Sequence, residues 1–200
     1  MANCFILCCE ETSQALVIDP GAEEPALLEA LEGYSVPKIV ATHGHWDHVS
    51  GVPYLQREYG SEFLIHHAEL ECLRKWARDY NLEIKPSDFL GEGDVVKVGN
   101  IELKVLHMPG HSPGHLVLME ETERWLFTGD LLMQGSTAGA NVEGGNHDDF
   151  IRSMERMRNL EGDWKIYPGH FEESTMEWER EHNPYIKFKI KSAKTHTQGS

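Results

Sequence analysis

The 200-residue chain lacks the long apolar runs and the paired cysteine motifs that mark several large classes of protein. No apolar run approaches the roughly 20 residues that a transmembrane helix needs, and the first residues lack the basic region and cleavage site of a signal peptide. The cysteines are few (Cys4, Cys8, Cys9 and Cys72), and no Cys-x-x-Cys pair is present to bind zinc. We therefore expect a reduced protein with a cytoplasmic location.

Positive charge is also scarce, because 18 Lys and Arg residues stand against 33 Asp and Glu residues, for a formal net charge of -15. Such a surface repels phosphate backbones and anionic headgroups, so we expect no nucleic acid and no membrane as a partner. The expected partner is a small-molecule substrate, and the sequence leaves the oligomeric state open. The 40% hydrophobic and 26% charged fractions are those of an ordinary globular protein.

Hydrophobic patterning predicts one domain over residues 1–186, followed by a basic, disordered tail over residues 187–200. Each half of the domain runs through strands and then helix, so two sheets covered by outer helices are expected. The predicted strands are 3–9, 15–18, 38–41, 62–66, 94–98, 101–106, 115–119, 125–128 and 164–167, and the predicted helices are 25–31, 49–59, 69–80, 148–160 and 174–181.

Histidine is the residue in excess, at 12 of 200, and several histidines fall in one short motif. Residues 42–48 read Thr-His-Gly-His-Trp-Asp-His and directly follow an apolar strand. Strand alternation predicts that His43 and His45 point the same way, so that a turn brings both onto one metal ion. The small Gly44 lets the backbone turn close to that ion. Asp47 and His48 begin the next helix, beside the first metal and able to hold a second.

Three further metal-ligand candidates lie at predicted strand ends: His111, Asp130 and His170. Loops at one edge of a sheet pair are where a functional site is expected. A catalytic zinc takes three protein ligands and leaves a position for water. The seven candidates are too many for one such ion and suit two, if one carboxylate bridges them.

Imidazole and carboxylate ligands without thiolate favour zinc, with iron or manganese as alternatives. Two such divalent metal ions lower the pKa of bound water towards about 7, which makes hydroxide available at neutral pH. They also stabilise the oxyanion that forms when hydroxide attacks a carbonyl. The sequence therefore predicts an enzyme, a metallo-hydrolase.

The motifs resemble those of the metallo-β-lactamase superfamily and, within it, the small glyoxalase II-like hydrolases. The resemblance runs from residue 3 to about residue 186, with motifs in the family's order at 17–21, 42–48, 109–115, 128–130 and 168–170. It implies an α+β fold, a four-layer αβ/βα sandwich of two mixed sheets flanked by helices, with the metals at one edge. It also implies hydrolysis of a thioester, ester or lactone carbonyl.

The resemblance implies a division of the ligands between the two ions. His43, His45 and His111 would hold the first metal, and Asp47, His48 and His170 the second, with Asp130 and a hydroxide bridging them. Asp19 and His115 match positions from which family members orient the ligands through hydrogen bonds. Asp47 is also a candidate proton shuttle.

The chain departs from close relatives in the loop after Asp130. Where those relatives read Gly-Arg-Thr-Asp and then Gly-Asp-His, this chain reads Gly-Ser-Thr-Ala-Gly-Ala-Asn at 135–141 and Gly-Gly-Asn-His at 144–147. Two interpretations of loop 134–147 stay open, a mobile lid and an ordinary flexible loop. We also expect no C-terminal helical domain of the kind with which full-length glyoxalase II enzymes bind glutathione, so specificity for a glutathione thioester does not follow.

Two other functions stay open at the level of sequence. The first is a mononuclear iron oxidoreductase resembling the persulfide dioxygenases, with iron held by His43, His111 and Asp130, a facial triad known from oxygen chemistry. The second is a non-catalytic metal-binding protein. Iron content together with oxygen uptake would establish the first, and stoichiometric metal without turnover would establish the second.

Overall fold

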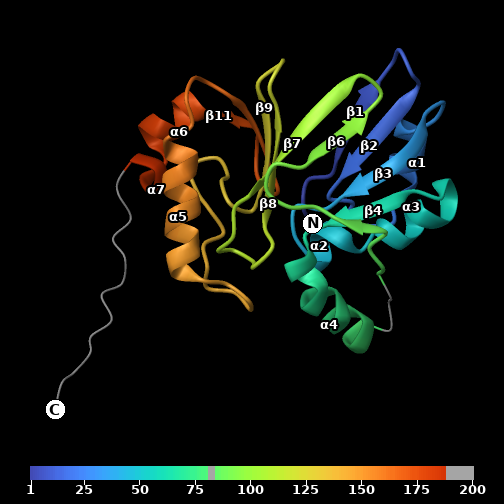
Figure 1. Cartoon of the computed structure of the whole chain (residues 1–200), viewed down its shortest axis with the longest axis horizontal. Helices are drawn as coiled ribbons and strands as arrows, with labels where there is room; N and C mark the ends of the chain where they lie inside the picture. Colours follow the sequence, from blue (N-terminus) through green and yellow to red (C-terminus); the bar gives the residue numbers. More distant parts are fainter. Residues whose placement is uncertain (81–83, 188–200) are drawn as a thin grey trace.

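Two mixed sheets pack face to face and carry helices on both outer sides in the computed structural model, which describes residues 1–80 and 84–187 (Figure 1). The first sheet has the strand order β1-β2-β3-β4-β5 and the second the order β11-β10-β9-β8-β7-β6. Three apolar clusters fill the spaces between the four layers. The expected αβ/βα sandwich is confirmed.

The first sheet uses the first half of the chain. Its strand β1 is antiparallel to β2, and strands β2 to β5 run parallel to one another. Parallel neighbours need crossover connections, which helices supply on the outer face. The elements are β1 (Phe5–Cys9), β2 (Gln14–Ile18), α1 (Pro25–Ala30), β3 (Ser35–Val40), α2 (Trp46–Val49), α3 (Val52–Tyr59), β4 (Glu62–Ile65), the 3-10 turn η1 (His67–Glu69), α4 (Leu70–Tyr80) and β5 (Asp88–Phe89).

The second sheet begins as an antiparallel meander, and a helix then crosses to a strand that runs parallel to β9. Helices α5, α6 and α7 cover its outer face (Figure 1). The elements are β6 (Val95–Val98), β7 (Ile101–His107), β8 (Leu116–Glu120), β9 (Trp125–Gly129), α5 (His147–Arg158), β10 (Lys165–Pro168), β11 (Ser174–Thr175), α6 (Met176–His182) and α7 (Pro184–Lys187).

Strand β8 shows why the central strands read as continuous apolar runs in the sequence. Leu116 and Leu118 pack between the two sheets, whereas Val117 and Met119 pack against the outer helices. Side chains alternate across a strand, so a sheet covered on both faces needs apolar residues at every position. All five residues of β8 are accordingly buried.

Several element boundaries differ from those predicted. The single helix expected at 49–59 is divided into α2 and α3, and Pro53 occupies the first turn of α3, where the missing N–H costs nothing. The helix expected at 174–181 starts later, because residues 174–175 pair with β10 as β11 and Thr175 then accepts the N-terminal hydrogen bond of α6. Strand β5 and helix α7 were not predicted. Lys187 is the last residue of α7, and the rest of the predicted tail, 188–200, lies outside the described residues.

The carboxyl ends of four strands meet at one edge of the sandwich. The N–H of Asp19, after β2, donates to the carbonyl of Val40 at 3.0 Å, and the N–H of Gly169, after β10, donates to Gly129 at 2.8 Å. A bond of 2.8 Å from the N–H of Leu116 to Thr42 joins the two sheets. Loops distant in sequence are thereby brought together at this edge.

Among the residues that the structure describes, no helix is long and apolar enough to cross a bilayer. The four cysteines are all free thiols. Cys9 is the buried one and donates to the Asn100 side chain at 3.1 Å.

Val105 and Val95 offer a test of the inter-sheet core. Val105 is fully buried between the sheets, whereas Val95 on edge strand β6 is 47% exposed. We expect Val105→Ala to lower the free energy of unfolding by about 2–3 kcal/mol, from lost apolar burial and the cavity left behind. Val95→Ala should cost less than about 1 kcal/mol. Urea unfolding measures both, and equal losses would contradict this assignment of the core.

Candidate metal centre

Three histidines bring ring nitrogens to one point at the sheet edge. Nδ1 of His45 lies 2.9 Å from Nε2 of His43 and 3.0 Å from Nε2 of His111. The strand alternation expected for the first two residues is not what aligns them, because β3 ends at Val40. His45 instead directly precedes α2 as its N-cap residue and turns its Nδ1 atom towards the other two rings.

Hydrogen bonds at the far side of the rings fix the tautomers of His43 and His111. The hydroxyl of Thr42 donates to Asp19 at 2.7 Å, so its oxygen accepts the Nδ1 proton of His43 at 3.1 Å. The carbonyl of Gly139 accepts the Nδ1 proton of His111 at 3.0 Å. Both Nε2 atoms therefore direct lone pairs at Nδ1 of His45, and one proton there satisfies at most one of them.

Burial keeps these rings uncharged. Desolvation lowers the pKa of His43 well below its usual value, and the neighbouring histidines lower it further. Desolvation, reinforced by His111, lowers the pKa of His45 to about 4. Neutral imidazole is the form that ligates metal.

A second group lies beside the first and contains Asp47, His48 and His170. Nδ1 of His48 donates to Asp19 at 2.9 Å, which leaves its Nε2 facing Asp130 Oδ1 at 3.4 Å. Nε2 of His170 lies 3.2 Å from Asp47 Oδ2. His48 Nε2 and Asp130 Oδ1 are buried and have no hydrogen-bond partner within the described chain. Buried polar atoms of this kind call for a missing partner.

Asp130 lies between the two groups. Its Oδ2 is 3.5 Å from Nε2 of His111, and its Oδ1 is 3.6 Å from Nε2 of His170. Burial raises the pKa of Asp130, but the facing His48 outweighs burial and lowers it to about 2. Burial likewise lowers the pKa of His48, and the Asp19 and Asp130 carboxylates outweigh it and raise it to about 10. Both pKa shifts show that a positive charge is favoured beside these carboxylates. A proton or a cation can supply that charge.

The arrangement fits divalent cations. Three sets of residues place their ligand atoms within 4.8 Å of one another, namely His43, His45 and His111; His43, His48 and Asp130; and Asp47, His48 and His170. These sets contain all seven residues predicted as ligands. Nitrogen and carboxylate oxygen atoms in such number are the donors that zinc, iron and manganese accept.

Asp19 and His115 contact the ligand residues from outside, as the resemblance implied. Asp19 adopts a left-handed conformation with φ +54°, a strained state for a residue other than glycine. Its carboxylate accepts from the Thr42 N–H and hydroxyl, each at 2.7 Å, in addition to His48. Nε2 of His115 accepts the N–H of Asp130 at 3.2 Å, and its ring stacks on that of His43.

Glu69 is a residue of this centre that sequence reasoning missed. Its carboxylate is fully buried and accepts from the N–H of Gly44 at 2.8 Å, the hydroxyl of Ser112 at 2.7 Å and the N–H of Gly114 at 2.6 Å. It therefore joins the two loops that carry the three converging histidines. No local sequence pattern identifies Glu69, because its two backbone hydrogen-bond partners lie 25 and 45 residues away.

Gly44 lies close to Glu69 and to the start of α4. A Cβ atom at this position would lie 2.9 Å from Oε2 of Glu69 and 3.2 Å from Cβ of Cys72. The carbonyl of Gly44 accepts the indole N–H of Trp76 at 2.7 Å and the thiol of Cys72 at 3.0 Å. These two hydrogen bonds anchor the 42–48 motif to α4.

Loop 134–147 contributes to the centre through Gly139, whose carbonyl holds the His111 ring. Its first residues are tied to the C-terminal helices, because the N–H of Gly135 donates to Glu179 at 3.1 Å and the amide of Asn183 donates to Ser136 at 3.0 Å. The sequence that departs from close relatives therefore still supports a candidate ligand.

Comparison with known proteins identifies the family. The model of the metallo-beta-lactamase superfamily matches residues 1–170, which include all seven candidate ligands. The chain belongs to this superfamily. Solved members of similar fold include the BLEG-1 B3 metallo-beta-lactamase, with a TM-score of 0.82 and 26% identity over 94% of this chain and 95% of that one. TTHA1623 in a di-iron-bound form has a TM-score of 0.80 and 30% identity over 92% and 95%.

Relatives in sequence include glyoxalase II homologues of this superfamily. An uncharacterized protein of Aquifex aeolicus is 38% identical over 92% of this chain and 90% of its own length. The hydroxyacylglutathione hydrolase GloC of Haemophilus influenzae is 29% identical over 94% and 93%. The hydroxyacylglutathione hydrolase of Polaromonas sp. is 30% identical, and the match covers 60% of its length.

Gly169→Ala tests the close packing around Asp130. A Cβ atom at this position would lie 2.4 Å from Asp130 Oδ1 and 2.8 Å from Cε1 of His48. We expect the variant to displace Asp130 and to weaken zinc affinity at least about tenfold, as loss of ligand orientation does elsewhere. Gly91→Ala is the control, because its Cβ would meet only Asp94 at 3.8 Å. Chelator competition measures both, and wild-type affinity in Gly169→Ala would contradict the assignment.

Glu69→Gln tests the link between the two ligand loops. Glutamine has the same shape, but its amide group replaces one of the two accepting oxygens and leaves a backbone N–H without a partner. We expect zinc affinity to fall by about 10–100-fold. Glu71→Gln, at a carboxylate that is 71% exposed, should leave affinity unchanged. Equal affinities of the two variants would show that the Glu69 carboxylate does not position the ligands.

Proposed function

We propose that this protein is a metal-dependent hydrolase that binds two divalent cations and cleaves a thioester, ester or lactone bond of a small-molecule substrate. The position of Asp130 carries the proposal, because its two oxygens face the two ligand groups separately. A carboxylate shared in this way suits a pair of cations better than a single one. Zinc is the proposed metal, and the di-iron form of TTHA1623 supports iron as the alternative.

The proposed ligands divide into two sets. His43, His45 and His111 would hold one cation and Asp47, His48 and His170 the other. Asp130, whose two oxygens face the two groups, would contribute to both. When bound, such a pair supplies Lewis acidity that lowers the pKa of water towards about 7 and polarises a carbonyl. Asp19 keeps the Nδ1 proton of His48, so that Nε2 stays available as a ligand atom.

Asp47 is the proposed proton carrier of the site. Its side chain is 40% exposed, whereas that of Asp130 is 9% exposed, so Asp47 can exchange protons with solvent. Its Oδ2 lies 3.2 Å from Nε2 of His170, within the proposed ligand set. A carboxylate in this place is suited to accept the proton that the attacking water releases and to pass it to the leaving group. The relatives named as hydroxyacylglutathione hydrolases support a thioester as the bond cleaved.

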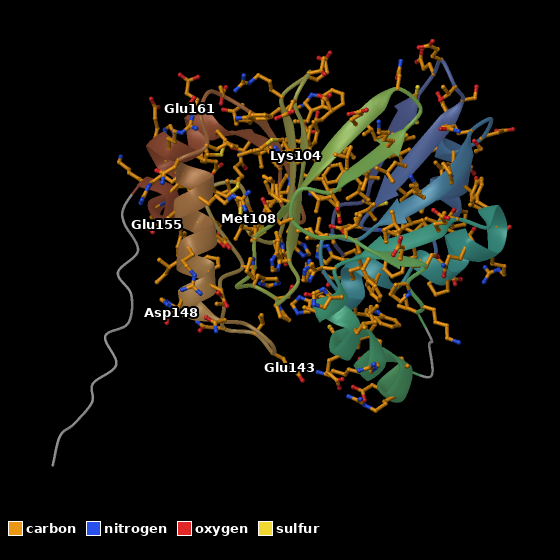
Figure 2. The ribbon with its side chains drawn as sticks, viewed as in Figure 1. Lys104, Met108, Glu143, Asp148, Glu155 and Glu161 are labelled. Atoms are coloured by element: carbon orange, nitrogen blue, oxygen red, sulfur yellow. The ribbon has the colours of Figure 1, made fainter. Side chains whose placement is uncertain are left out.

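Asp130→Ala and His45→Ala test the proposed centre. We expect each to lower turnover of a panel of thioesters and lactones at least about 100-fold, because each removes a ligand, while circular dichroism shows the fold retained. Asp148→Ala is the matched control, at an exposed carboxylate in the first turn of α5 (Figure 2). Full activity of either site variant at native metal content would overturn the assignment.

Metal analysis combined with activity separates the remaining alternatives. Two zinc ions per chain and turnover without oxygen uptake support the hydrolase. Iron content with oxygen uptake on a persulfide supports the oxidoreductase that would use His43, His111 and Asp130. Stoichiometric metal with no turnover of any thioester, lactone, β-lactam or phosphodiester supports a non-catalytic role.

A further inference from the structure

A cavity of about 230 Å³ opens beside His45, between α4 and loop 134–147. Its walls include Cys72 and Trp76 from α4, Ala68 from the turn before it, and Pro113 from the loop that carries His111. One of its lining residues is thus a proposed metal ligand. A substituent placed in the cavity would lie directly beside the reacting bond of a substrate.

Trp76 and Cys72 of α4 present carbon to the cavity because their polar atoms bond elsewhere, whereas Glu71, Lys75 and Arg78 of the same helix bring charged groups to its lining. The indole N–H of Trp76 and the thiol of Cys72 both donate to the carbonyl of Gly44, outside the cavity. The Trp76 ring also packs against Trp46 and Tyr80, with ring centroids 5.8 and 5.9 Å away. Trp76 and Cys72 therefore form a braced, apolar part of this wall, beside its charged residues.

The charges of the lining do not favour an anion. Lys75 forms an ion pair with Glu143, at the tip of the loop that reaches towards α4 (Figure 2), and Arg78 pairs with Glu71 at 3.3 Å. Glu69 adds a third carboxylate, so acidic residues outnumber the two basic ones among the lining residues. Both basic side chains of the lining are already paired, so an anionic group in the cavity would have to separate an existing ion pair, and only a group at the His45 end would come near the proposed cations.

We propose that this cavity takes a neutral, apolar substituent of the substrate, about as large as a phenyl ring, on the acyl or the leaving-group side of the scissile bond. An apolar cavity of about 150 Å³ is large enough to bind benzene. The 230 Å³ found here therefore holds a phenyl ring or a short branched chain. The inference rests on the proposed hydrolase function and specifies the class of substrate that it acts on.

Matched thioesters test the charge preference on each side of the bond. On the acyl side, butyryl and succinyl thioesters of N-acetylcysteamine have the same number of carbons, and succinyl adds a carboxylate. On the leaving-group side, acetyl thioesters of 1-propanethiol and of 3-mercaptopropionate make the corresponding pair, with three carbons each. We expect kcat/KM to be at least about tenfold higher for the neutral member on one side. Equal values, or preference for the anion, on both sides would overturn the proposal.

Ala68→Phe tests whether the preference arises in this cavity. The added ring should fill the space and lower kcat/KM for a phenylacetyl or benzyl thioester about tenfold, as a change of a few carbons in a pocket does. The acetyl thioester of N-acetylcysteamine should change less than about twofold. Ala26→Phe, at an exposed position of α1, is the control. An unchanged ratio of large to small substrates in Ala68→Phe would overturn the proposal.

Lys75→Met distinguishes an apolar cavity from an anion site. The variant removes a positive charge from the lining and should keep the wild-type preference for the neutral over the anionic thioester of the pair. If Lys75 instead recruits an anion, the wild-type protein will prefer succinyl and the variant will lose that preference, which would refute the proposal.

A binding measurement separates failure of this inference from failure of the proposed function. If the zinc-loaded protein cleaves no thioester, ester or lactone, the hydrolase proposal is wrong, but the cavity can still be examined with benzyl alcohol and benzoate by ligand-observed NMR. We expect benzyl alcohol to bind more tightly than benzoate and to lose at least about tenfold in affinity in Ala68→Phe. Tighter benzoate binding, or benzyl alcohol affinity unchanged in the variant, would overturn the inference.

Discussion

Asp130 carries a buried negative charge between two groups of imidazole rings, and a buried charge is costly unless it is compensated. Its Oδ1 has no hydrogen-bond partner within the described chain, and the Nε2 atoms of His48 and His170 face it at 3.4 and 3.6 Å. A proton on His48 meets this demand in the metal-free molecule, and cations would meet it in the loaded one. The donor arrangement is therefore built for positive charge.

The candidate ligand atoms are held at this edge by hydrogen bonds to residues that are not themselves candidate ligands. Asp19 is kept in a left-handed conformation that costs about 1–3 kcal/mol. Three hydrogen bonds to Thr42 and His48 offset that cost and orient the ligands at the same time. Glu69 performs a comparable role between the loops of His43 and His111. Ligand orientation and local stability thus arise from the same buried carboxylates.

Helix α4 connects the metal centre to the cavity beside it. The carbonyl of Gly44 accepts from Trp76 and Cys72, so hydrogen bonds join the wall of the cavity to the backbone of the ligand motif. Loop 134–147 faces α4 across the cavity and supports His111 through Gly139. The loop thus lines the cavity and supports a candidate ligand at the same time.

The amino-acid sequence by itself determined the alternation of strands and helices, the four-layer architecture and the seven residues that converge at the sheet edge. These features can be predicted from short stretches of sequence, because apolar periodicity and the motif at 42–48 are each recognisable within about ten residues. The sequence did not predict that the helix expected at 49–59 is divided in two. A proline such as Pro53 is compatible with the first turn of a new helix as well as with a break.

Only the tertiary structure decided the role of Glu69, the Nδ1 approach of His45 and the ion pair of Lys75 with Glu143, whose residues lie 68 positions apart. Each depends on how α4 and the loops pack across the sheet edge. Local sequence preferences specify which side chains are available, but the distances between chain segments far apart in sequence are set by the packing of the whole core.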